Sequence, residues 1–383
     1  MSALNNKGIY FECLVDYVRV QKYLCSIAEK LSRLGERVIW PLYHTLTYPV
    51  YGEFNHQVYT KFKESILEGK YDIVHAMTPM MPRYPVEAIK ACTSTPFILG
   101  PVNGGVPFPK GFQKVARQEF SDFNFLRSIG RFIIPGYRET YTKADYILAG
   151  STYTLNLVKE LFDIKNEKIE LFYENGIGSS FLKNEASVAE RTTIGSSVIN
   201  LLFVGRLVPY KGADILIDAI SRVKPSIRNN LRLTIVGDGS ERKALEQLVE
   251  KHKLTAIIAF TGWVDQKDTL QYYSNSNIFC FPSIREFGGA VVLEAMANGL
   301  PCIVVNNGGI GEYVTEETGF RINPESREFV VRELTVCIEK LVTNPLLRKT
   351  MSIKAIQRVK EFTWSAKAEA IVRIYNKQLI HRV

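Results

Sequence analysis

The stretch that decides the fold, residues 286–301, reads Glu-Phe-Gly-Gly-Ala-Val-Val-Leu-Glu-Ala-Met-Ala-Asn-Gly-Leu-Pro. It predicts a tight Gly-Gly turn after a strand, followed by a helix over Ala290–Asn298. Glu286 lies in the turn, and Glu294 lies about a turn and a half into the helix. Two carboxylates and the free N–H groups of a helix start then face one place, which suits a ligand with both hydroxyls and phosphates.

Short β-branched apolar runs alternate with helical patterns around this stretch. Such continuous apolar strands predict a parallel sheet that is covered by helices on both faces. We therefore expect an α/β fold of the doubly wound type. The predicted strands are Val198–Val204, Leu231–Val236, Ile257–Phe260, Ile278–Phe281 and Cys302–Val305, and the predicted helices are Ala213–Val223, Glu241–Lys251, Lys267–Ser274 and Ala290–Asn298.

The first half of the chain alternates less regularly. An amphipathic helix over Leu14–Leu34 comes before the first clear strand, whereas a doubly wound domain should open with a strand. That first strand is therefore predicted to be missing, or very short around Ile9–Phe11. A long helical region is expected over Gln113–Lys143, and strands are expected at Arg37–Trp40, Ile73–Ala76, Pro96–Gly100 and Tyr146–Ala149.

The length of 383 residues favours two domains. The stretch Lys183–Ser197 is polar and without a clear period, so we expect the linker there. The predicted division is residues 1–185, residues 186–362 and a last helical segment, residues 363–383, after a break at Thr363-Trp364.

Composition narrows the class of protein. No run approaches the ~18–20 apolar residues of a membrane span, and the first residues lack an apolar signal core, so a cytoplasmic protein is expected. The six cysteines form no Cys-x-x-Cys pair and have no histidine at ligand spacing, so neither disulfides nor a metal is expected. The net charge of +9 suits an anionic ligand, an anionic membrane surface or simply a solvated basic surface. Without a nucleic-acid-binding motif, no nucleic acid partner is expected.

A basic pair follows the strand Val198–Val204. Arg206 and Lys211 lie in its carboxyl-end loop, the edge at which open α/β sheets bind ligands. A guanidinium fork and an ammonium suit a diphosphate, although a solvated loop would also hold them. Glu286 could likewise be a capping or surface carboxylate, and Glu294 could lie on a solvated helix face. Neither a Gly-x-Gly-x-x-Gly motif nor a P-loop is present, so the sequence supports neither hydride transfer on a dinucleotide nor NTP hydrolysis by a P-loop enzyme.

Two features of the first half point to a ligand less strongly. The turn over residues 100–111, Gly-Pro-Val-Asn-Gly-Gly-Val-Pro-Phe-Pro-Lys-Gly, is expected at the ligand edge of the first sheet and contains Asn103 and Gly104. His75 ends the strand Ile73–Ala76, where it could be a catalyst but is more often a packing residue.

Taken in order, these motifs resemble the retaining glycosyltransferases of family 4, also called glycosyl transferases group 1, which have the GT-B fold. The resemblance is specific over residues 200–320: Val-Gly-Arg-Leu, Val-Gly-Asp-Gly-Ser-Glu-Arg, Phe-Thr-Gly-Trp-Val, the Glu-x7-Glu stretch, and Gly-Gly-x2-Glu. The first half matches more loosely, through Asp72–His75, Ala149–Ser151 and Asn175–Ile177.

The resemblance implies two Rossmann-like domains that face a central cleft, with the last helix crossing back to the first domain. The second domain would bind the nucleotide-sugar donor and the first the acceptor. Roles follow by motif position: Arg206 and Lys211 on the donor diphosphate, Glu286 on the transferred sugar with backbone N–H groups of Phe287, Gly288 and Gly289, Glu294 on the ribose, and Val264 beside the base. The acceptor-side candidates are Gly8, left from the glycine-rich loop after the family's first strand, with His75, Asn103 and Gly104.

The implied activity is retaining transfer of a hexose-type sugar, from a UDP-sugar by preference or from GDP-mannose, to a hydroxyl of a glycan or lipid-linked glycan. No metal is expected, because Arg206 and Lys211 would stabilise the departing diphosphate. The alternatives are a binding or scaffold subunit with little turnover, and a phosphorylase or epimerase of similar fold. A peripheral membrane contact is a further hypothesis, because Phe112–Tyr141 interleaves basic and aromatic residues, although packing inside the domain explains that pattern too.

Overall fold

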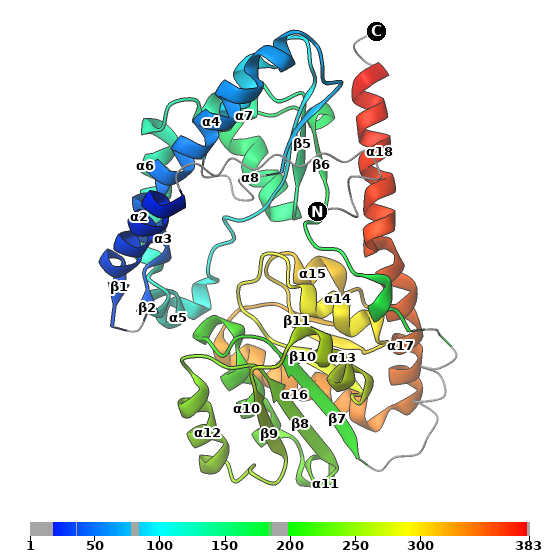
Figure 1. Ribbon diagram of the computed structural model, residues 1–383. Coiled ribbons are helices and arrows are strands. Elements are labelled where there is room, and N and C mark those ends of the chain that lie inside the picture. The colour runs from blue at the N-terminus through cyan, green and yellow to red at the C-terminus, as the bar shows by residue number, and fades with distance from the viewer. Residues whose placement is uncertain (1–17, 36, 78–83, 184, 186–197, 381–383) are drawn as a thin grey trace.

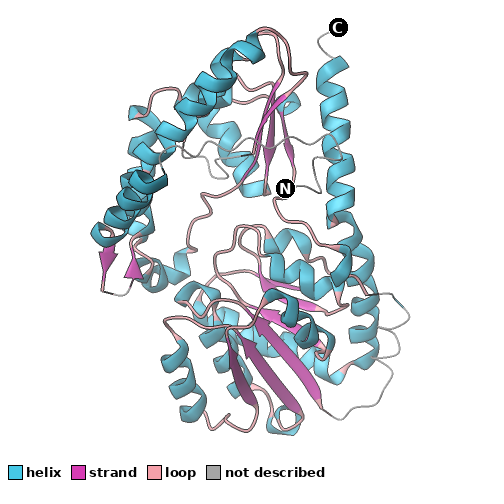
Figure 2. Ribbon diagram, in the orientation of Figure 1, coloured by secondary structure: helices cyan, strands magenta, loops and turns pink. Residues whose placement is uncertain are grey.

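The structure is a computed structural model that describes residues 18–35, 37–77, 84–183, 185 and 198–380. The predictions for Gly8 and for a first strand around Ile9–Phe11 concern residues outside these ranges, as does most of the predicted linker. Two parallel sheets, one in each half of the chain, carry the architecture (Figures 1 and 2).

The second half forms the six-stranded sheet that the sequence predicts. Its order is β12-β11-β10-β7-β8-β9 and every pairing is parallel. The order therefore reverses between β7 and β10, and ligands of open α/β sheets bind at such a switch point. The bounds are β7 Ile199–Val204, β8 Leu231–Val236, β9 Ile258–Gly262, β10 Ile278–Phe281, β11 Cys302–Val305 and β12 Gly319–Ile322, of which β12 was not predicted.

Helices cover this sheet, and two of its inner strands, β10 and β11, are buried throughout. All four residues of β10 and of β11 are buried, as expected for parallel strands covered on both faces. The helix α10 (Ala213–Arg222) packs on α12 (Arg242–Lys251) and α16 (Arg327–Thr343), whereas α14 (Ala290–Ala297) packs on α17 (Pro345–Val359). The thiols of Cys280 and Cys302 lie inside this core, where burial raises their pKa and keeps them protonated.

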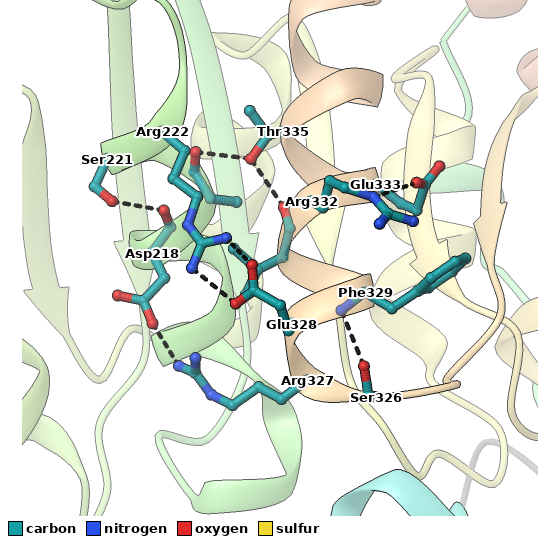
Figure 3. Close-up of polar contacts among 12 residues, drawn as sticks. Asp218, Ser221, Arg222, Ser326, Arg327, Glu328, Phe329, Arg332, Glu333 and Thr335 are labelled. Carbon is teal, nitrogen blue, oxygen red and sulfur yellow. Dashed lines mark hydrogen bonds and ion pairs between the residues drawn. The ribbon is translucent and has the colours of Figure 1, made fainter.

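Ion pairs join α10 to α16 at the surface of this half (Figure 3). The Arg327 guanidinium donates to Asp218 at 2.6 Å and to Asp214 at 2.9 Å. Arg222 forms a two-bond pair with Glu328 beside them. These bonds join the first residues of α16 to Asp214, Asp218 and Arg222 of α10.

The first half contains a four-stranded parallel sheet of order β3-β4-β5-β6. Alternate residues of β4 face opposite sides: Phe97 and Leu99 pack with helix residues such as Tyr141, whereas Ile98 packs toward Ile374 of the last helix. Both faces are thus covered. The bounds are β3 Val74–Ala76, β4 Phe97–Val102, β5 Tyr146–Ala149 and β6 Ile169–Leu171, with α8 Thr152–Phe162 between β5 and β6.

One strand prediction for this half is wrong. The run Arg37–Trp40 is no strand of the sheet: β2 (Arg37–Val38) pairs antiparallel with β1 (Arg33–Leu34), and α3 (Trp40–Leu46) begins directly after it. The helical region predicted over Gln113–Lys143 is confirmed, and it is divided where Phe120 adopts φ 53° and Gly136 φ 75°. Its pieces are α5 Gln113–Gln118, the 3-10 turn η3 Ser121–Asn124, α6 Phe125–Ile133 and α7 Tyr137–Thr142, and they join α2 Val18–Leu31 and α4 Tyr48–Leu67 in a helical layer (Figure 1).

The last helix, α18 (Trp364–Ile380), lies along the first half of the molecule (Figure 1). It leaves the second half where Ile177 exchanges backbone hydrogen bonds with Phe362 and Trp364, and it packs Ile374 on the first sheet. Among the helices of the described ranges, none combines the length and apolar character that crossing a membrane requires.

Candidate active site

The loop from β10 to α14 is built on close backbone approaches that require glycine. Glu286 pairs with Gly308 in an isolated parallel bridge, and the N–H of Gly309 donates to the Glu286 carbonyl at 3.2 Å. Gly308 has φ 95°, and a Cβ on it would overlap that carbonyl oxygen. The Gly-Gly-x2-Glu segment after β11 therefore sets the position of Glu286.

Lys211 meets Glu286 across the switch point of the sheet. It ends a 3-10 turn, Pro209–Lys211, that follows β7, and its Nζ forms an ion pair with Glu286 Oε2. The Ser283 hydroxyl donates to the same oxygen at 3.3 Å. The side chains of Lys211 and Glu286 are only 11% and 13% exposed, so their charges interact with little screening by water. Arg206 lies nearby and donates to the Tyr210 hydroxyl at 2.7 Å.

A cavity of about 340 Å³ opens in front of this pair. The start of α14 forms one wall, through Gly289, Ala290 and Val291, with Gly289 in the left-handed region at φ 60°. The first N–H groups of a helix have no partner within it and carry the positive end of its dipole. The cavity therefore joins an ammonium, a carboxylate and a helix start, which is the combination that a phosphorylated sugar can use.

Glu294 is buried, not solvated. Its side chain is 6% exposed and accepts a hydrogen bond from the Tyr273 hydroxyl at 2.7 Å and another from Gln266 Nε2 at 3.2 Å. Both donors lie on α13 (Gln266–Ser274), two turns apart and hence on one face. The carboxylate raises the pKa of Tyr273 further, beyond the large effect of burial, so this phenol remains a donor.

Asn103 and Gly104 lie where the two halves meet, but their polar groups are already used. The side-chain oxygen of Asn103 accepts from the Gly104 N–H, the Ser151 hydroxyl and the Thr154 hydroxyl at 2.9–3.1 Å. Its amide nitrogen donates to the Phe287 carbonyl at 3.2 Å. With 2% of Asn103 exposed, this side chain joins the first half to the Glu286 loop.

His75 is also a packing residue here. Its Nδ1 lies 2.7 Å from the Tyr375 hydroxyl of α18, and its Nε2 lies 2.7 Å from the Gly100 carbonyl. Burial lowers its pKa, and a carbonyl partner requires a proton on Nε2, so the ring is neutral with Nδ1 accepting from Tyr375. His75 thus joins β3, β4 and α18.

Two residues of the site were missed by the sequence reasoning. Glu174, after β6, lines the same cavity as Glu286, and its pKa is raised by burial and by the Glu286 charge, against a hydrogen bond from Asn103. Arg285 donates to the Val106 carbonyl at 2.7 Å and stacks on Phe108 and Phe287. The signal for Arg285 was its place beside Glu286, whereas Glu174 had none beyond the Asn-Gly-Ile that follows it.

The structure brings together most of the donor-side residues that the sequence predicts. Lys211, Glu286 and the backbone of Phe287–Gly289 line one cavity, and Arg206 lines an adjoining one with Lys211 and Glu286. Val264 lies apart from both, half-buried in the loop between β9 and α13 and packed on the core. Within the described ranges, no group of histidine, cysteine or acidic side chains is arranged to hold a metal ion.

The chain is similar to known sugar-transferring proteins. The model of the family glycosyl transferases group 1 matches residues 189–358. An uncharacterised glycosyltransferase of Methanocaldococcus jannaschii is 28% identical over 63% of this chain and 62% of its own length. The first curated relatives are matched over 58–62% of their length, so this chain spans about three fifths of them.

Solved structures show the fold. Sucrose-phosphate synthase from Thermosynechococcus elongatus superimposes with a TM-score of 0.60 at 21% identity, over 86% of this chain and 79% of that one. Anabaena HepE in complex with UDP gives 0.57 at 18% identity, over 84% and 82%. The predicted GT-B architecture of two Rossmann-like domains is confirmed by this likeness and by the two parallel sheets.

Proposed function

We propose that this chain, a member of the glycosyl transferases group 1 by its residues 189–358, transfers a hexose-type sugar from a nucleotide-diphosphate sugar to an acceptor hydroxyl. The observation that carries the proposal is the cavity in which Lys211, Glu286 and the start of α14 meet. In the reaction the bond from the sugar to the diphosphate breaks and a bond to the acceptor oxygen forms. The acceptor oxygen approaches the anomeric carbon from the face that the diphosphate leaves, so configuration is retained, and the acceptor proton passes to the departing diphosphate without a separate base.

The chain's cations would act on the leaving group. Negative charge grows on the diphosphate as the bond breaks, and Lys211, Arg206 and the N–H groups of α14 stabilise that charge more in the transition state than in the ground state. We infer that these groups do the work that a metal ion does in other transferases. When the donor binds, the Lys211 ammonium would pair with the phosphate instead of with Glu286. The Glu286 carboxylate would then be free to accept hydrogen bonds from the sugar hydroxyls.

Glu294 would bind the ribose hydroxyls. Its carboxylate has four acceptor positions, of which Tyr273 and Gln266 use two, so it can still accept from a diol. A UDP-sugar is the favoured donor, supported by the UDP in the HepE structure. GDP-mannose is the second choice, and Val264 is proposed to lie beside the base.

A pair of variants with a control tests the site. Lys211→Met and Glu286→Gln should each lower the transfer rate by about 100- to 1,000-fold, the size of effect that a lost charge-stabilising group has. Lys224→Met removes a lysine whose partner is Glu339, away from the cavity, and should leave the rate unchanged. Wild-type rates in both cavity variants would contradict the proposal, and tight UDP binding without turnover would favour a binding subunit instead.

The acceptor is proposed to be a glycan or a lipid-linked glycan. The segment Phe112–Tyr141 divides in the structure: Phe112, Tyr137 and Tyr141 are buried, whereas α6 exposes Phe132 to 88% and Ile133 to 70%. The exposed part supports peripheral contact with an anionic membrane. Co-sedimentation with liposomes tests this: binding should increase with the anionic lipid fraction, and equal binding without anionic lipid would argue against it.

A further inference from the structure

An apolar cavity of about 320 Å³ lies in the first half of the molecule. The helices α3 and α6 and the start of α4 enclose it. Its lining is aliphatic and aromatic almost throughout, including Pro41, Tyr48, Leu126, Ile129, Ile133 and Ile134. None of the residues that would act on the donor lines it, so it is a separate feature of the fold.

This apolar cavity continues into a polar one. Pro41, His44 and Arg127 line both the apolar cavity and a second cavity of about 360 Å³. The second cavity is lined in turn by Arg206, Lys211 and Glu286, which belong to the other half of the molecule. A molecule in the apolar cavity would therefore have its other end within reach of the donor site, with basic side chains at the junction.

The surface beside the apolar cavity is unusual for a water-exposed helix. Phe125, Ile129, Phe132 and Ile133 of α6 are 45–88% exposed, and Ile129 and Ile133 also line the cavity. Arg127 and Arg131 stand among them on the same helix. Apolar side chains interspersed with arginine are the composition of a helix that lies at a membrane interface, from which a lipid chain could enter directly.

We propose that this cavity binds the hydrocarbon chain of an amphiphilic acceptor with an anionic, phosphate-type head group. The chain fills the space beneath α6, the anionic group lies beside Arg127, and the part that carries the accepting hydroxyl extends toward Glu286. This deepens the proposed function and rests on it for the identity of the reaction. A peptide or a second copy of the chain could also fill the apolar cavity, but neither would explain why this cavity is continuous with the donor site.

The test uses n-alkyl phosphates of about 8 to 14 carbons, below their micelle concentrations, titrated into the 383-residue chain by calorimetry. Burial of each methylene contributes about 0.8 kcal/mol, so the affinity should rise about fourfold per added carbon until the cavity is full. Gly130 lines the cavity, and a Cβ placed there would face Ile134 at 3.3 Å. Gly130→Phe should therefore plug the cavity and abolish the dependence on chain length.

Phe132→Ser is the matched control, because Phe132 lies two residues away on the same helix, is 88% exposed and does not line the cavity. It should keep the chain-length dependence. Circular dichroism and UDP binding, both unchanged, would show that Gly130→Phe is folded with an intact donor site.

An affinity independent of chain length, or unaltered by Gly130→Phe, would overturn the proposal. So would a dimer in sedimentation that Gly130→Phe converts to monomer, since a second copy would then be the occupant. If the wild-type protein shows the chain-length dependence but transfers no sugar, the proposed reaction alone would be refuted.

Discussion

The hydroxyl of Tyr273 offers a direct test of how Glu294 is held. Tyr273→Phe removes one oxygen from a fully buried ring and leaves the ring's packing unchanged. The lost bond is a 2.7 Å donation to a carboxylate that is itself 6% exposed. Hydrogen bonds to charged groups contribute about 1.5–3 kcal/mol. Because Gln266 remains as a donor at 3.2 Å, we expect a loss of about 2 kcal/mol in the free energy of unfolding.

Urea denaturation measures this loss, provided that the slopes of the transitions agree between variants. Tyr272→Phe is the matched control, since Tyr272 precedes Tyr273 on α13, packs on the same core and provides no bond to Glu294. It should change stability by less than about 0.5 kcal/mol. UDP binding should also weaken in Tyr273→Phe, because the carboxylate loses its orientation. Equal stability of the two variants would refute the idea that Tyr273 supports a buried, charged Glu294.

Three further predictions, one with a control variant, test other parts of the structure. Gly308→Ala should lower the free energy of unfolding, measured in urea, by about 1–3 kcal/mol, because Gly308 has a positive φ and contacts the Glu286 carbonyl. Gly52→Ala is the control: Gly52 lies in α4 with nothing within 4 Å, so this change should raise the free energy of unfolding by about 0.5–1 kcal/mol. For His75, burial lowers the folded pKa, so below about pH 6.5 the unfolded chain binds the proton first and stability falls; His75→Gln should reduce that fall between pH 7.5 and 5.5, and an identical fall would count against the buried neutral ring. Burial lowers the pKa of Lys367 to about 8. Between about pH 8 and 10.5 only the unfolded chain keeps this lysine protonated, so stability should rise with pH over that window. In Lys367→Met the denaturation midpoint should rise less over the same window.

Local pattern was enough to predict the second half of the fold. The runs Leu231–Val236, Ile278–Phe281 and Cys302–Val305 are strands with those bounds, because burial on both faces makes a strand continuously apolar. The first half was harder. Arg37–Trp40 has the apolar character of a strand, but helix α3 takes over from Trp40, and only a two-residue ribbon forms before it.

What the residues by themselves determined is the set of carboxyl-end loops and the chemistry on them. Arg206, Lys211, Glu286 and Glu294 were identified from residue type and position after a predicted strand, since strand ends and helix starts are local properties. The order of the strands is not local. Only that order brings β7 beside β10 and so joins Lys211 to Glu286, 75 residues apart.

The tertiary structure also decided which polar groups remain available to a ligand. Asn103 and His75 were acceptor-side candidates by their positions at strand ends, but Ser151, Thr154 and the last helix use their hydrogen-bonding groups. The exposure of α6 and the cavity beneath it could not be predicted either, because the same pattern of interleaved basic and aromatic residues occurs in packed and in exposed helices. A side chain's type is set by the chain, whereas its partners and its access to solvent depend on which distant segments fold against it.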